Sequence, residues 1–302
     1  MAKQTQRKKQ SLLNGALILV VSTVIVKLVS IFYKIPITNI LGPVGRSYYN
    51  SAYAIFIPVY SIALAGLPTA ISRMVSHHMA LGEYRHVRQT LRVAKKIFLF
   101  TGTIGTILLI ALAYPYATTA KNPEAFRSIL VLAPSVFFCC VMSTYRGYYN
   151  GLRNMTPTAF SEVIEAVAKL VIGVIISEEV VAFGLSQFRN GGVVFGVACA
   201  SESEAMSAIY PYAAAGAIGG VTLGTVLAFL YLAIRYRIRG DGITPSELAA
   251  SPEPLRQKAM ARQLIAIALP IVASTIIFNI TNLIDSWTIQ NRIRTITETD
   301  LD

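Results

Sequence analysis

Several ionisable side chains lie inside long apolar stretches of this 302-residue sequence. Lys27 and Lys34 are seven residues apart, or two helical turns, so one face of a helix would carry both. Glu162, Glu165 and Lys169 follow an i, i+3, i+7 pattern and would also share a face. Because a charge inside a membrane is costly unless it meets a polar cavity or a partner, all five are candidate functional residues.

The lysines indicate a site for an anion, because cationic side chains in a cavity suit phosphate or diphosphate groups. Lys27 lies sixteen residues into its apolar run, too deep to reach the interface, whereas Lys34 has the alternative of extending to the outer interface. Arg73, near the end of the next apolar run, would supply a third cation. The cytoplasmic preference of basic residues explains Arg73 equally well.

The acidic residues allow two interpretations. Glu165 precedes Lys169 by four residues, which is the favourable order for an ion pair within one helix. Such a pair would hide its own charge inside a helix bundle. Alternatively, the group forms a gate or contacts a ligand, and it exchanges partners between conformations. Asp285 lies near the outer end of the last apolar run. We therefore predict that Glu162, Glu165, Lys169 and Asp285 are polar residues of a cavity or gate.

Long uncharged runs must form the elements that position these side chains. A membrane-spanning helix needs about 20 mostly apolar residues. The sequence is 54% hydrophobic and 14% charged, whereas a soluble domain carries about a quarter of its residues as charges. These values exclude an ordinary cytosolic enzyme and a disordered chain. We expect an all-α, polytopic membrane protein with seven helices, near 11–41, 46–76, 92–117, 126–149, 156–177, 206–236 and 263–288.

The net charge of +12 reflects membrane topology. Of the 27 Lys and Arg residues, 18 fall in the N-terminal tail and in alternate connections, 6 in the other connections and 3 inside spans. This count includes Arg146 among the residues that flank a cytoplasmic turn. The split is typical of a protein whose N-terminus is cytoplasmic. This distribution predicts that the basic residues face the lipid bilayer, and we expect no nucleic acid as a partner.

Composition also divides the chain into segments. Segment 178–204 contains four acidic residues and an Asn-Gly-Gly turn, and we expect an external loop with an interfacial or re-entrant piece. Prolines and an Asp-Gly pair mark a linker between helices six and seven. The predicted divisions are a basic cytoplasmic tail at 1–10, a transmembrane lobe at 11–239, a cytoplasmic linker at 240–260 and a further helix within 261–302.

Small residues and histidines give two more expectations. Gly216 and Gly220, followed by Gly224, form a four-residue step that lets a neighbouring helix approach closely. His77, His78 and His86 lie on a basic cytoplasmic connection at spacings that fit no common metal motif, so we expect a solvated helical segment and no metal site.

Two segments carry motifs of a known family. Segment 41–76 contains Leu-Gly-Pro-x-Gly and Gly-Leu-Pro-x-Ala-Ile-Ser-Arg. Segment 146–169 contains Arg-Gly-Tyr-Tyr-Asn-Gly, Met-Thr-Pro-Thr-Ala and Ser-Glu-Val-Ile-Glu. The sequence resembles the stage V sporulation protein B-like and MurJ-type lipid II flippases, within the multidrug/oligosaccharidyl-lipid/polysaccharide exporter superfamily. The motif positions here are Gly66, Pro68, Arg146, Gly147 and Pro157.

The resemblance implies two helical lobes around a central cavity that opens alternately to each side of a bacterial plasma membrane. It implies transport of an undecaprenyl-diphosphate-linked saccharide, lipid II or a related precursor, from the inner to the outer leaflet, without enzymatic chemistry. Lys27 falls at a diphosphate-contacting position and Lys34 within about a residue of another. The chain would be the N-terminal part of such a transporter, which needs a C-terminal lobe or a second copy to complete its cavity.

Two other functions stay open. A cation-coupled multidrug antiporter on the same fold would use acidic cavity residues. A polytopic glycosyltransferase would need an acidic loop at the membrane surface, for which only Glu202–Glu204 is available. We expect no cofactor and no metal; the energy source would be the membrane potential or a monovalent ion. The potential drives an anion outward by about 2.3 kcal/mol per charge per 100 mV.

Overall fold

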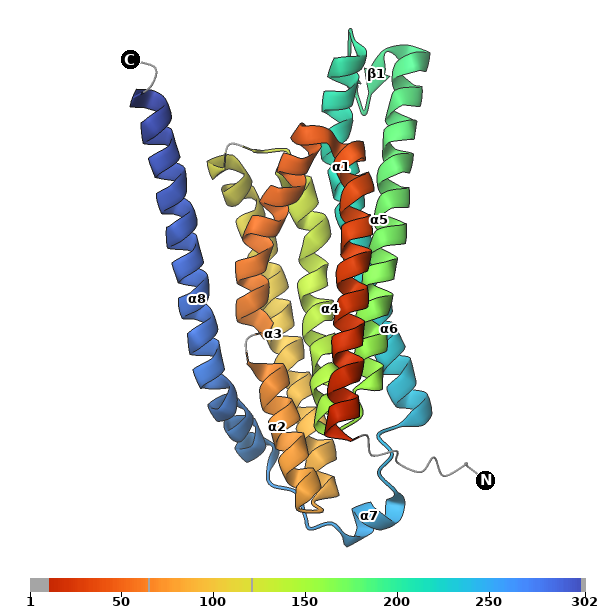
Figure 1. Ribbon diagram of the computed structural model, residues 1–302, viewed down its shortest axis with the longest axis vertical. Helices are drawn as coiled ribbons and strands as arrows, with labels where there is room; N and C mark the ends of the chain where they lie inside the picture. Colours follow the sequence, from red (N-terminus) through yellow and green to blue (C-terminus); the bar gives the residue numbers. More distant parts are fainter. Residues whose placement is uncertain (1–10, 65, 121, 300–302) are drawn as a thin grey trace.

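The computed structural model describes residues 11–64, 66–120 and 122–299, with the side chains of residues 12, 279–280 and 282–299 excepted. Long helices run side by side along the molecule (Figure 1). The elements are α1 (Leu12–Leu64), α2 (Leu67–Ala80), α3 (Tyr84–Thr119), α4 (Ala125–Gly151), α5 (Thr156–Gly191), β1 (Val193–Val194), β2 (Val197–Ala198), α6 (Glu202–Arg239), α7 (Pro245–Ala250) and α8 (Gln257–Thr299).

The all-α class is confirmed for the part of the chain that the structure describes. Its strands form only a two-stranded antiparallel hairpin, β1–β2. Within the residues that the structure describes, length and composition give five candidate membrane spans: Leu13–Ala80, Tyr84–Thr119, Ala125–Gly151, Glu202–Arg239 and Gln257–Phe278. Large apolar side chains such as Phe100, Ile107 and Ile175 are exposed on the outside of the bundle, as expected of a surface that contacts lipid.

The helix α1 contains two passes along the bundle, joined at Gly42. This residue adopts φ 57° and ψ −170°, outside the helical region, and Pro43 follows it. The positive φ is accessible to glycine because it has no Cβ. The chain rises from the N-terminal end to Gly42 and then turns back toward α2 (Figure 1). The first two expected helices are therefore two passes, although the hydrogen-bonded helix is nearly continuous between them.

The second helix, expected near 46–76, is divided between the end of α1 and α2. α1 ends at Leu64 and α2 begins at Leu67, because Gly66 adopts the left-handed conformation with φ 69°. Pro68 then lies in the first turn of α2, where a missing backbone N–H costs nothing. A Cβ on residue 66 would lie 2.8 Å from the carbonyl oxygen of Ala268 on α8, so Gly66 also permits close contact with that helix.

The external loop expected at 178–204 is wrong. α5 continues to Gly191 and ends at Gly192, which has φ 63°. The hairpin follows, and the hydroxyl of Ser201 then accepts a hydrogen bond from the Glu204 N–H at the start of α6. The acidic residues of α5 end the apolar run without ending the helix, because Glu is a good helix former. Charge marks the edge of the apolar layer and not the end of a helix.

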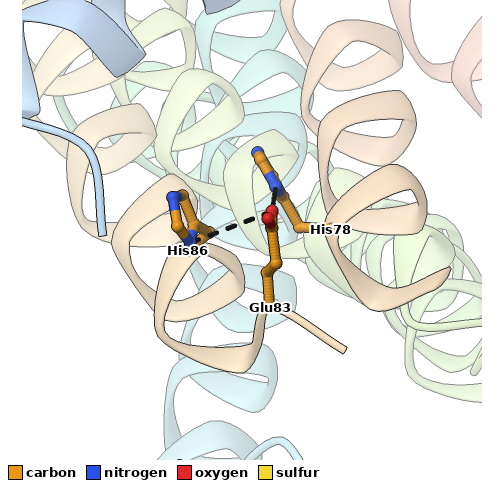
Figure 2. Close-up of side chains that lie close together, drawn as sticks. All are labelled: His78, Glu83 and His86. Atoms are coloured by element: carbon orange, nitrogen blue, oxygen red, sulfur yellow. Dashed lines mark hydrogen bonds and ion pairs between the residues drawn. The ribbon is translucent and has the colours of Figure 1, made fainter. Parts of the chain in front are cut away.

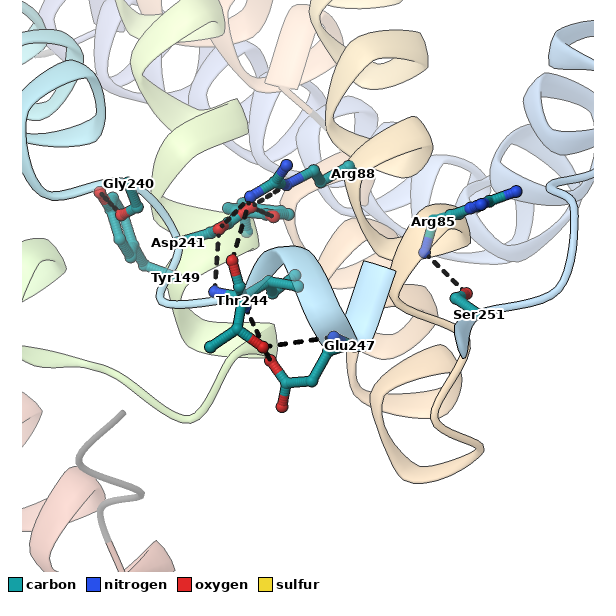
Figure 3. Close-up of polar contacts among 10 residues, drawn as sticks. Arg85, Arg88, Tyr149, Gly240, Asp241, Thr244, Glu247 and Ser251 are labelled. Atoms are coloured by element: carbon teal, nitrogen blue, oxygen red, sulfur yellow. Dashed lines mark hydrogen bonds and ion pairs between the residues drawn. The ribbon is translucent and has the colours of Figure 1, made fainter. Parts of the chain in front are cut away.

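Polar contacts hold the segment between α6 and α8 against the start of α3 (Figure 3). Arg88 Nε donates to Asp241 at 2.8 Å, and the Tyr148 hydroxyl donates to the same carboxylate at 3.0 Å. Arg85 Nε donates to the carbonyl oxygen of Leu248 at 2.9 Å. Burial alone would raise the pKa of Asp241, but the hydrogen bonds, led by that from Arg88, lower it below its ordinary value.

Candidate functional site

A cavity of about 370 Å³ lies between α1, α4, α5 and α6. Apolar residues alternate in its wall with charged and hydroxylated side chains, which include all three candidate residues on α5. The predicted common face of these residues is therefore confirmed. The polar side chains that line the cavity are Ser30, Tyr53, Tyr60, Ser135, Arg146, Glu162, Glu165, Lys169 and Thr225.

Arg146 and Glu165 form the central ion pair of the cavity. Arg146 Nη2 on α4 lies 2.9 Å from Glu165 Oε2 on α5, and Arg146 Nε donates to the Ser161 hydroxyl at 2.9 Å. The other carboxylate oxygen of Glu165 accepts from the Thr225 hydroxyl on α6 at 3.4 Å. Both side chains of the pair are largely buried, at 18% and 28% exposed. The pair thus joins three helices at one point inside the lobe.

Lys169 contacts aromatic side chains of α1. Its ammonium group donates to the Tyr53 hydroxyl at 3.3 Å and lies 4.8 Å from the centre of the Tyr33 ring. A cation over an aromatic face is stabilised by the quadrupole of the ring. The Tyr33 hydroxyl donates to the carbonyl oxygen of Ala217 on α6 at 3.2 Å, which holds that ring in place. In the described part of the chain, Lys169 therefore has aromatic rings and a hydroxyl as neighbours, and it forms no ion pair with a carboxylate.

The intrahelical Glu165–Lys169 pair, one of the two interpretations of the sequence, does not form. Among the residues described, the ion pair of Glu165 is with Arg146 on a different helix. Glu162 accepts a hydrogen bond from the Ser22 hydroxyl on α1 at 3.0 Å. Each charged residue on this face of α5 thus has its own neighbour outside α5: Glu162 and Lys169 contact the two passes of α1, and Glu165 contacts α4. This arrangement is compatible with a gate or a ligand contact.

Arg146, which the charge count includes among the residues that flank a turn, is part of the cavity wall. Arg146 lies within α4 and faces the cavity. Arg146 lies five residues before the end of α4. A count of basic residues near helix ends does not distinguish a loop residue from one that points inward. The family motif that contains Arg146 was the better signal.

Lys27 and Lys34 lie outside the cavity, on the exposed face of α1. Between and beside them, Thr23, Ser30 and Thr38 complete a polar stripe along this helix, with steps of four, three, four and four residues. Each of these hydroxyls donates to a backbone carbonyl of its own helix, at 2.7–2.8 Å. Ser30 also lines the cavity, so the stripe borders the cavity along one edge.

The remaining candidates lie apart from this group. Arg73 is exposed on α2, and it is not among the residues that line the cavity. Asp285 lies on α8, among the side chains that the structure does not describe, so its predicted role stays a prediction.

The glycine and proline motif positions serve helix packing. A Cβ on Gly147 would lie 2.6 Å from the carbonyl oxygen of Pro68, so α4 and α2 meet in backbone contact there. Pro157 is buried in the first turn of α5. These motif residues hold the helices that carry Arg146 and Glu165, and they do not themselves line the cavity.

Sequence analysis missed the tyrosines of the second pass of α1. Tyr53 and Tyr60 line the cavity, and they form a continuous row of ring contacts with Tyr49 and Phe56. Residues 49, 53, 56 and 60 follow steps of four, three and four, so their helical spacing was a readable signal. An aromatic stripe at this spacing usually indicates core packing, and the sequence alone does not distinguish core packing from the lining of a cavity.

Comparison with known proteins places these features in a family. A family model described as polysaccharide biosynthesis protein matches residues 12–297. The lipid II flippase MurJ of Bacillus subtilis is 24% identical over 92% of this chain and 49% of its own length. The stage V sporulation protein B of the same organism is 24% identical over 90% of this chain and 48% of its own. The chain thus spans about half the length of these curated relatives.

A solved structure shares the fold. It is that of a MOP superfamily transporter from Pyrococcus furiosus, and it superposes with a TM-score of 0.60 at 16% identity. The match covers 94% of this chain and 57% of the transporter. The apolar spans and the membrane relatives together establish a multi-pass membrane protein.

Proposed function

Because this chain belongs to the polysaccharide biosynthesis protein family, we propose that it forms one wall of a path for a prenyl-diphosphate-linked saccharide. The substrate would be lipid II or a related cell-envelope precursor, and it would move from the inner to the outer leaflet. The curated relatives that support this proposal include a protein named as a lipid II flippase.

The polar stripe of α1 is the observation that carries the proposal. Lys27 and Lys34 are both exposed on this helix, where they alternate with three hydroxylated residues. A lysine in the middle of an apolar span is costly when it faces lipid. It is stabilised when it faces a hydrated path that an anionic headgroup crosses, because ammonium groups form charge-assisted hydrogen bonds with phosphate oxygens.

The charge of the cavity discriminates this function from cation export. Inside the cavity, two basic side chains, Arg146 and Lys169, balance two acidic ones, Glu162 and Glu165. The lysines of the stripe then give the path as a whole an excess of positive charge. Such an excess favours an anionic substrate over the cationic substrate of a multidrug antiporter.

Transport would proceed by alternating access, with no covalent step. The prenyl tail stays in lipid while the headgroup follows the stripe. The Arg146–Glu165 pair joins α4 to α5, so it would break if these helices separate as the protein changes shape. For a headgroup with about two negative charges, an inside-negative potential of about 100 mV contributes roughly 4–5 kcal/mol to outward movement. A second lobe or a second copy of this chain would supply the opposite wall.

The experiment measures binding and leaflet transfer for the same variants. We expect Lys27→Ala to weaken binding of undecaprenyl diphosphate by about tenfold or more, because a charge-assisted hydrogen bond contributes about 1.5–3 kcal/mol. Lys27→Arg should retain binding. Lys258→Ala, which removes an exposed lysine from the first turn of α8, away from the stripe, is the matched control. Fluorescent undecaprenyl-diphosphate saccharide in proteoliposomes then reports transfer between leaflets.

Unchanged binding and transfer in Lys27→Ala would remove the stripe from the substrate path. Uptake of a fluorescent organic cation, abolished by Glu162→Gln, would instead favour the antiporter. Formation of a new glycosidic bond from the labelled lipid would favour the glycosyltransferase.

A further inference from the structure

Two histidines and a glutamate meet at the turn between α2 and α3, away from the cavity described above (Figure 2). His78 is in the last turn of α2, Glu83 precedes α3, and His86 is in the first turn of α3. His78 Nδ1 lies 2.6 Å from Glu83 Oε2, and His86 Nδ1 lies 3.9 Å from the same oxygen. The two imidazole rings stack with their centres 4.8 Å apart.

Both histidines are buried, so the solvated segment expected here is wrong. His78 is 7% exposed and His86 is 6% exposed, whereas the adjacent His77 is exposed. The turn at Leu81 and Gly82 brings the end of α2 back over the start of α3. Two histidines eight residues apart in the sequence therefore present their rings to a single carboxylate.

His86 carries a polar atom without a partner. Its Nδ1 is buried and makes no hydrogen bond with any residue that the structure describes. The carboxylate of Glu83 is in its direction but too far for a hydrogen bond, at 3.9 Å. Leaving a buried nitrogen unpaired is unfavourable. A metal ion placed between this unpaired imidazole nitrogen and the carboxylate would be bound by both.

We propose that His78, Glu83 and His86 bind one divalent transition-metal ion of the zinc type. The ligands would be Nδ1 of each histidine and a carboxylate oxygen of Glu83, with water in the fourth position. The three ligand atoms lie within 4.8 Å of one another. Tetrahedral zinc with ligands at about 2.0–2.1 Å needs separations of about 3.4 Å, which small side-chain rotations provide.

The nearby cations do not occupy this site. Arg85 and Arg88 are close to His86 in the sequence, but both bind the segment between α6 and α8. The Arg88 guanidinium binds Asp241 (Figure 3), and the Arg85 guanidinium donates to the carbonyl oxygen of Leu248. Arg88 is paired with Asp241, which offsets its charge. Glu83 thus remains the acidic partner of the two imidazoles, and its pKa is lowered chiefly by the hydrogen bond from His78.

Metal binding would be coupled to the position of the following helix. The Leu255 N–H donates to His86 Nε2 at 3.2 Å, just before α8 begins. A neutral imidazole that binds a metal through Nδ1 carries its proton on Nε2. Nε2 can then no longer accept from Leu255. Metal binding at the turn therefore breaks a hydrogen bond that holds the start of α8 to α3.

The test uses the purified 302-residue chain in detergent with Zn²⁺ and Co²⁺ as probes. Calorimetry with Zn²⁺ should give one site per chain, and Co²⁺ should give the visible absorption of a tetrahedral centre. His78→Gln and His86→Gln should each weaken Zn²⁺ binding by about 100-fold or more, since even removing groups that only orient a metal ligand costs about 10–100-fold. His77→Gln, beside the site, should bind like the unsubstituted chain.

Two further measurements keep the result interpretable. X-ray absorption of the zinc-loaded, unsubstituted chain should show nitrogen and oxygen ligands only, whatever the folding of the variants. Hydrogen exchange of the peptide that contains Leu255 should become faster when Zn²⁺ is added.

The site is overturned if the unsubstituted chain binds no Zn²⁺, if sulfur ligands appear, or if His78→Gln and His86→Gln bind as tightly as His77→Gln. Exchange at Leu255 that does not change on stoichiometric binding overturns the coupling to α8.

Discussion

Glu162 and Glu165 are neighbours on α5, yet their surroundings differ. Glu165 is paired with Arg146 and accepts a further hydrogen bond from Thr225. Glu162 accepts a hydrogen bond from the hydroxyl of Ser22, and no ion pair of its own is present among the described residues. A partly buried ion pair is expensive to break, because the remaining charge loses its compensation. The two carboxylates should therefore differ in their contribution to stability.

We predict that Glu165→Gln destabilises the lobe by about 1.5–3 kcal/mol, the contribution of a hydrogen bond to a charged group. Glu162→Gln should cost less than about 1 kcal/mol, because an amide still accepts from a hydroxyl. Denaturant unfolding of both variants in detergent measures the difference. In a double-mutant cycle, Arg146→Gln together with Glu165→Gln should cost less than the sum of the single changes. Equal losses for the two glutamates would contradict this assignment.

Residue spacing predicted which charged side chains share a face, but not their partners. The i, i+3, i+7 pattern is a property of one helix, so it correctly placed Glu162, Glu165 and Lys169 together. The partner of Glu165 is 19 residues away on another helix. Glu165 pairs with Arg146 and not with Lys169 of its own helix because of how α4 and α5 pack, and no local sequence pattern contains that packing.

At the scale of elements, the contact between α5 and α6 depends on glycine. A Cβ on Gly220 would lie 2.3 Å from the backbone of Gly173, and one on Gly224 would lie 2.8 Å from the carbonyl oxygen of Glu165. The small-residue face expected on the sixth helix is therefore in close contact with the helix that carries the acidic residues. This contact sets the distance of Thr225 from the carboxylate of Glu165.

We predict that Gly220→Ala destabilises the lobe by about 1–3 kcal/mol, because an added methyl group must separate two backbones. Gly219→Ala is the matched control on the same helix. Its Cβ would meet only a Val131 methyl group at 3.8 Å, so the change should be neutral or slightly stabilising through helix propensity. Thermal unfolding in detergent separates the two. If Gly220→Ala were as stable as Gly219→Ala, the close approach of α5 and α6 would be wrong.

At the scale of the whole molecule, the two ends of the bundle differ in charge. The α2–α3 turn and the segment before α8 lie at the end where the chain enters, and the β1–β2 hairpin lies at the opposite end (Figure 1). In the described part of the chain, the helix ends and connections at the first end carry more basic residues than those at the opposite end. Since basic residues are retained in the cytoplasm, this end should be cytoplasmic.

Cysteine labelling in intact cells tests this orientation. An impermeant maleimide should label Val197→Cys in the hairpin without permeabilisation. Leu81→Cys, in the α2–α3 turn, should be labelled only after the membrane is opened. Both positions are exposed, and the native cysteines, Cys139, Cys140 and Cys199, are buried, so the unsubstituted chain serves as the unlabelled control. The reverse pattern would place the N-terminus outside.

The sequence by itself determined the class of this protein, its apolar spans and the sharing of helical faces, because hydropathy and helical period are local properties. Only the tertiary structure decided that Arg146 pairs with Glu165 across two helices, that α5 continues past its acidic residues, and that two histidines become buried at one turn. Each of these depends on which atoms of distant segments come within a few ångströms of one another. That proximity arises from packing, and spacing along the chain does not encode it.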